Sequence, residues 1–132
     1  MPLPTELEPI TGAQELYDWF GFWPGFHDAE VINLHLNRRG PSRLVIHTWE
    51  MTDRVDSKGH YELAKHVVVE FILKDVAALS LEGFSKQNVI FGLAIEKIEP
   101  GFRLTLDPCY GLSGSIAAES MSISLTPGKP DS

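Results

Sequence analysis

The residues best suited to chemistry are the adjacent His27 and Asp28, which lie in the stretch F-G-F-W-P-G-F-H-D-A-E-V at 20–31. Both residue types bind ions in metallohydrolases, but such enzymes draw further His and Asp ligands from surrounding elements. Zinc sites built from local sequence use spacings such as H-E-x-x-H, H-x-x-E-H or paired cysteines, and none of these occurs in the chain. The sequence therefore predicts no metal site, and a metal-dependent hydrolase using His27 and Asp28 is the less favoured alternative.

Other candidate reactive groups lie far apart in the sequence. His35 and His47 could face each other across the first hairpin, where we expect a polar cross-strand pair rather than a metal site. Cys109 lies in the turn-like stretch D-P-C-Y-G, with no helix N-terminus or adjacent cation to activate its thiol. No glycine-rich run leads into a helix that carries a lysine, as a phosphate-binding loop would. We therefore predict no catalytic residue and no cofactor, and we expect that the chain is not an enzyme.

A structural role explains the His-Asp pair more simply. Asp28, at the entry to the first strand, can accept backbone N–H bonds in a turn, while His27 can anchor the loop through its ring nitrogens. Four aromatic residues surround the pair, and we expect most of them to cover the core and any exposed one to offer a binding patch. They are Phe20, Phe22, Trp23 and Phe26.

One short helix is expected before this loop. Thr11 followed three positions later by Gln14 fits a capping box, and Gly21 supplies a left-handed stop. Between them, apolar residues recur at helical spacing. They are Ala13, Leu16, Tyr17 and Phe20.

Nearly everything after residue 28 follows the two-residue period of β-strands. A polar link at 52–61, with Gly59 as its turn, separates the second strand from the third. The sequence predicts an α+β fold with one N-terminal helix packed on a largely antiparallel, curled β-sheet of about six to seven strands, as a sandwich or partial barrel. The predicted strands are 31–36, 43–51, 65–74, 77–82, 88–98, 102–107 and 115–125.

The 132 residues are expected to form one domain at 11–126, with a proline-containing N-terminal arm at 1–10 and a C-terminal tail at 127–132. The single cysteine and the absence of a signal-peptide pattern favour the cytoplasm, and no apolar run is long enough to span a membrane. The net charge of −7 disfavours nucleic acid and favours a basic partner. Charge leaves open whether the chain is a monomer or a homodimer.

Four sequence blocks are distinctive when taken together. They are W-P-G-F-H-D-A-E-V at 23–31, H-T-W-E-M-T at 47–52, G-H-Y-E-L-A-K-H at 59–66 and L-E-G-F-S-K-Q-N-V-I-F-G-L at 81–93. A fifth, weaker block is Y-G-L-S-G-S at 110–115. Together they resemble the immunity protein 50 family, small bacterial proteins assigned to polymorphic toxin systems, and the resemblance spans residues 16–125.

The resemblance implies a non-catalytic protein that binds and neutralises a cognate toxin, for which a nuclease with a basic cleft is one candidate. It carries over no catalytic residue and identifies no toxin-binding residue. Ser85 and Lys86 depart from the family pattern, which often has Asn and His there. We expect a structural motif that organises the loop against the sheet, in which Gln87 and Asn88 make side-chain to backbone bonds. Its residues are Trp23, Pro24, Phe26, His27, Asp28, Gln87 and Asn88.

Two further alternatives stay open from the sequence. A structural or oligomerisation module would form a symmetric dimer through a sheet edge or face. A small-ligand barrel would enclose an apolar pocket lined by Trp49, Phe71 and Phe91.

Overall fold

The computed structural model describes residues 3–130, apart from the side chains of 51–53 and 61–62. It contains one short α-helix and six antiparallel strands, which confirms the predicted mainly antiparallel fold. In chain order, the elements are a 3-10 helix η1 (Thr5–Leu7), α1 (Ala13–Phe20), β1 (Glu30–His35), β2 (Ser42–Val55), β3 (Tyr61–Glu82), β4 (Val89–Lys97), β5 (Phe102–Tyr110) and β6 (Ser113–Pro127).

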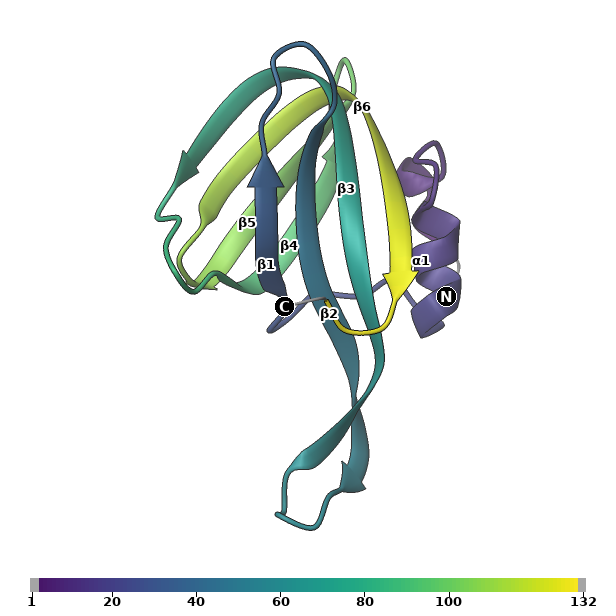
Figure 1. Cartoon of the computed structure of the whole chain (residues 1–132). Coiled ribbons are helices and arrows are strands. Elements are labelled where there is room, and N and C mark those ends of the chain that lie inside the picture. Colours follow the sequence, from purple (N-terminus) through teal and green to yellow (C-terminus); the bar gives the residue numbers. More distant parts are fainter. Residues whose placement is uncertain (1–2, 131–132) are drawn as a thin grey trace.

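The six strands form one sheet whose order, β1-β2-β3-β6-β5-β4, closes on itself (Figure 1). Closure is narrow, because β1 and β4 pair only at Glu30 and Val89. By contrast, β3 pairs with β6 from Val67 to Glu82, and this long ladder joins the two halves of the sheet.

The predicted strands 65–74 and 77–82 are one strand, so the sheet has six strands rather than seven. Asp75 has a left-handed backbone, with φ 56°, and the pairing of β3 with β6 shifts register between Val76 and Ala78. A bulge of this kind bends a strand and increases its twist without ending it. The gap predicted between residues 74 and 77 is therefore a bend within one strand.

β2 and β3 continue together past the rest of the sheet as a two-stranded ribbon (Figure 1). The prediction of a polar link at 52–61 was wrong in extent, because both strands extend into it and leave only a tight turn. Within this turn, the N–H of Asp56 donates to the carbonyl of His60 at 2.8 Å. The turn at Gly59 is confirmed by its left-handed φ of 85°.

The predicted helix is present, but its capping box is not. Gly12, with φ 93°, is the N-cap residue and provides no side-chain bond, while Gln14 Nε2 donates to Asp18 instead. A Cβ at Gly12 would lie 1.8 Å from the carbonyl oxygen of Ile123, so the close approach of β6 requires glycine at the cap. The predicted stop at Gly21 is confirmed, because its φ is 83° and its N–H donates to Tyr17.

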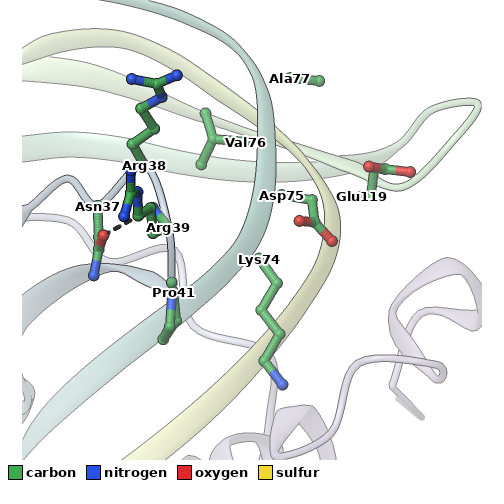
Figure 2. A pocket seen from close by; sticks show the side chains of 10 residues that line it. Asn37, Arg38, Arg39, Pro41, Lys74, Asp75, Val76, Ala77 and Glu119 are labelled. Carbon is green, nitrogen blue, oxygen red and sulfur yellow. Dashed lines mark hydrogen bonds between the residues drawn. The ribbon is translucent and has the colours of Figure 1, made fainter.

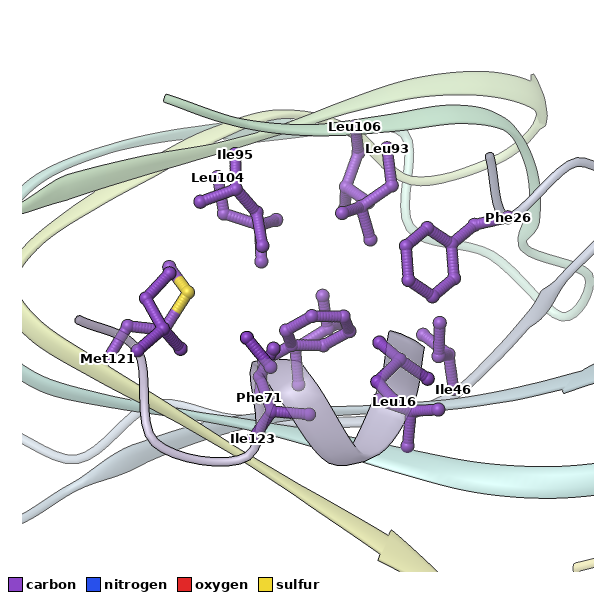
Figure 3. Packing of buried hydrophobic residues seen from close by; sticks show 14 of the residues in the cluster. Leu16, Phe26, Ile46, Phe71, Leu93, Ile95, Leu104, Leu106, Met121 and Ile123 are labelled. Atoms are coloured by element: carbon purple, nitrogen blue, oxygen red, sulfur yellow. The ribbon is translucent and has the colours of Figure 1, made fainter. Parts of the chain in front are cut away.

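The core is one cluster of apolar side chains inside the closed sheet (Figure 3). Leu93 and Leu106 of β4 and β5 face Phe71 of β3 and Leu16 of α1 across this interior, and Phe26 lies at one end. The N-terminal residues Leu3, Leu7 and Ile10 are buried in the same cluster. In the portion of the chain that the structure describes, no helix has the length and apolar character needed to cross a membrane.

Candidate functional site

Two backbone hydrogen bonds join the loop that carries His27 and Asp28 to β4, and a third joins the start of β1 to the residue before β4. The N–H of Asp28 donates to the carbonyl of Ile90, and the N–H of Ile90 donates to Ala29, both at 2.8 Å. The N–H of Val31 donates to Asn88, also at 2.8 Å. These bonds hold the loop where β1 and β4 meet, so its side chains have defined positions.

His27 and Asp28 point outward from this corner. Their side chains lie 3.6 Å apart, between His27 Nε2 and Asp28 Oδ1, and both are about half exposed. His27 Nδ1 lies 3.2 Å from the carbonyl oxygen of Phe91, and the His27 ring contacts the Phe91 ring edge-on. The His27 side chain is thus held by Phe91 of β4. Asp28 is instead bonded to β4 through its backbone, since its N–H donates to the carbonyl of Ile90.

The aromatic residues of the loop divide into two groups. Phe20 and Phe26 are buried, and Trp23 packs against the core with its ring 6.1 Å from that of Phe26. Pro24 is also buried. Phe22 is 47% exposed, so the expectation of core cover for most of these residues is confirmed and Phe22 is the exposed one.

Asn88 joins two segments through its side chain, its own loop and the turn before β6. Its Oδ1 accepts from the N–H groups of Ser85 and Leu112, both at 3.0 Å, and its Nδ2 donates to the carbonyl of Ser85 at 2.8 Å. Gln87 is exposed, and its bonds to Ser85 run through its backbone. Asp28, Gln87 and Asn88, which sequence reasoning grouped together, line one hollow of about 280 Å³.

The predicted pair of His35 and His47 is wrong. His35 pairs with Arg43 across the hairpin, and His47 pairs with Glu30. His47 instead meets His66 of β3, with 3.0 Å between His47 Nε2 and His66 Nδ1. Both rings also contact Trp49. The sequence offered no signal for this pair beyond the presence of both histidines in strand-like runs.

The His47–His66 pair should make stability depend on pH. Burial is the main cause that lowers the pKa of both rings, and the nearby Lys129 lowers both pKa values further. The pKa of His47 is also lowered by His66 and raised by Glu30. Below the ordinary histidine pKa of about 6.5, the unfolded chain therefore binds more protons than the folded chain. The contribution of the two histidines to the free energy of unfolding is therefore complete above about pH 6.5. It is lost as the pH falls below this value and through the lowered pKa values of the folded state.

We expect the free energy of unfolding, measured by urea titration, to fall between about pH 7.5 and about pH 5.5. The variant His66→Gln should lose less stability over this range, since the second ring is gone. His35→Gln, at an exposed histidine, serves as the control and should behave like the wild type. An unchanged pH dependence in His66→Gln would contradict this role for the pair.

A shallow hollow of about 270 Å³ brings the aromatic loop to β2, with Phe22, His27, Trp49 and Glu50 among its lining residues. Phe91, which is 56% exposed, lies against His27 at one side of it. We call these five residues the aromatic patch. Aromatic residues are enriched at protein interfaces relative to the rest of the surface.

The proposed ligand cavity of Trp49, Phe71 and Phe91 is wrong. Phe71 is fully buried in the core, while Phe91 is exposed on the outside of the sheet. The small-ligand alternative thus loses the residues on which it depended. Cys109 is also placed differently from its turn-like prediction, because it is an exposed residue of β5.

The loop between β1 and β2 lines a third hollow, of about 530 Å³, at which basic and acidic side chains meet (Figure 2). Arg38 and Arg39 lie on one wall, and Asp75 and Glu119 lie on the other. The arginines therefore do not form a uniformly basic surface. Among the described residues, no three His, Cys, Asp or Glu side chains are grouped so that they could hold a metal ion.

Comparison with known proteins confirms the resemblance noted in the sequence. A model of the family described as immunity protein 50 matches residues 12–126, which include the helix, all of β1 to β5 and nearly all of β6. A search of curated proteins and a search of solved structures found no match.

Proposed function

Because the chain belongs to the immunity protein 50 family, we propose that it binds a cognate toxin in the cytoplasm of the producing bacterium and neutralises it without catalysing a reaction. The observation that carries this proposal is the family match over residues 12–126, which covers the loop, the sheet and the aromatic patch together. A binding role also agrees with exposed aromatic rings held on a rigid sheet, since such rings supply much of the energy of protein interfaces.

The charge of the chain supports a basic surface on the toxin. There are 18 acidic and 11 basic residues, which give a net charge of −7. Nucleases bind phosphate backbones through basic clefts, so a nuclease of a polymorphic toxin system would attract an acidic inhibitor and could be blocked by it.

The function is tested by using this protein as bait for the toxin domain encoded immediately upstream of it, and by co-expressing the two. A stable complex and restored growth are expected. An unrelated acidic protein of similar net charge is the control, and it should neither bind nor restore growth. If the chain itself does neither, the function is rejected for that toxin, and the family membership is unaffected.

We expect salt to slow the formation of this complex. Raising the ionic strength from about 0.05 M to about 0.5 M should lower the association rate by about tenfold or more, because salt screens long-range steering. The dissociation rate should change less, since it depends on short-range contacts. Stopped-flow mixing measures both rates. An association rate that does not change with salt would remove the electrostatic part of the proposal.

A further inference from the structure

The aromatic patch has the features of a site for one cationic side chain. Its hollow of about 270 Å³ lies below the usual range for small-molecule and cofactor pockets. Rings form much of its lining, and Glu50 adds a carboxylate. A hollow of this size and composition suits a single side chain that is both flat and positively charged.

The walls of the hollow are held in place before any partner binds. Phe22 contacts the buried Phe20, with 6.2 Å between ring centroids. Trp49 contacts the ring of His47 at 4.9 Å. His27 is fixed by Phe91 through one ring contact and one bond to its carbonyl oxygen. Rings that are already ordered lose little conformational entropy on binding, which favours their use as anchor points.

The charges at the patch favour a positively charged side chain on the partner. Glu50 lies 3.4 Å from Lys65, and its carboxylate stays partly exposed, so it can accept from a second cation. Asp28 lines the neighbouring hollow of about 280 Å³, and its half-exposed carboxylate adds negative charge at the edge of the patch, 3.6 Å from His27 Nε2. Arginine suits this setting better than lysine, because its planar guanidinium stacks on aromatic faces while it donates to a carboxylate.

We infer that the aromatic patch receives an arginine side chain of the toxin, which stacks on the exposed rings and pairs with Glu50. This inference rests on the proposed function and adds the face and the chemistry of recognition. A second apolar surface, at Leu36, Leu79 and Phe84, carries no comparable ordered rings and supplies the control residues.

The test measures the Kd of the upstream-encoded toxin domain for the wild type and four variants. Phe22→Ala and Glu50→Gln should each raise the Kd about tenfold or more. Phe84→Ala and Glu82→Gln, exposed residues of the second surface, should change it by less than about twofold. Patch variants that bind like the wild type, or control variants that bind as weakly as the patch variants, would overturn the inference. Circular dichroism checks that each variant is folded.

Failure of the inference and failure of the proposed function give different results. Wild-type binding that the patch variants retain rejects the patch and keeps the function. If the wild type does not bind the toxin, acetyl-arginine amide is titrated into the labelled protein, and the NMR signal of the Trp49 indole N–H is followed. A shift that is absent with acetyl-norleucine amide supports the patch, and no shift overturns it.

Discussion

Replacement of Phe26 by alanine is expected to lower the free energy of unfolding by about 3–5 kcal/mol, the usual cost of removing a buried aromatic side chain. Phe26 is only 2% exposed, and its ring lies 5.9 Å from that of Phe71 and 6.1 Å from that of Trp23. Figure 3 shows it at the end of the core, where the loop enters. Phe26 is therefore a buried aromatic anchor of the loop, alongside the buried Pro24 and the partly buried Trp23.

Urea unfolding of the wild type, Phe26→Ala and Phe84→Ala measures the effect. Phe84 is a matched control, since it is a phenylalanine that is 61% exposed, and its replacement should change stability by less than about 0.5 kcal/mol. A loss of under about 1 kcal/mol in Phe26→Ala would contradict the anchoring role. It would mean that neighbouring side chains fill the space left by the ring and that the loop keeps its place without it.

The same substitution should also weaken toxin binding. Phe26 is among the residues that line the hollow of the aromatic patch, together with Phe22 and His27 from the same loop. A loop that loses its buried anchor gains freedom, and ordering it again on binding costs free energy. Stability and recognition are thus linked through one buried ring.

Much of the fold could be predicted because it depends on local patterns. The apolar spacing of Leu16 and Phe20, followed by Gly21, defines a helix and its end within a few residues. The alternation in β3 places Val67, Val69 and Phe71 on the inner face, as predicted. Such patterns need no knowledge of distant partners.

Contacts between strands could not be predicted in the same way. Lys65 and Asp75 have left-handed backbones although neither is glycine, so no residue type announced the two irregularities of β3. The pairing of β2 with β3 shifts register between Thr48 and Glu50, opposite Lys65. The register of the first hairpin pairs His35 with Arg43 and His47 with Glu30, and this is why His47 does not face His35.

The sequence identified residues of the candidate site but did not predict what each of them does. The sequence placed Gln87 and Asn88 in the same structural role, because both amides can bond to nearby backbone. In the structure, only Asn88 is buried and bonded through its side chain, whereas Gln87 is exposed. The burial of Asn88 depends on how the segment at 110–112, which is distant in sequence, packs against the loop that carries Asn88.

Replacement of Asn88 by alanine is expected to cost about 2–4 kcal/mol, because it leaves backbone groups without partners. The N–H of Leu112 is the most sensitive of these groups, since Leu112 is buried and water cannot easily replace Asn88 Oδ1. Asn88→Asp keeps the acceptor for both N–H groups but places a carboxylate oxygen against the carbonyl of Ser85, so this variant should also lose stability. Gln87→Ala should change stability by less than about 0.5 kcal/mol. Urea unfolding ranks the three variants, and an equal effect of Asn88→Ala and Gln87→Ala would show that the Asn88 side chain does not hold the two segments together.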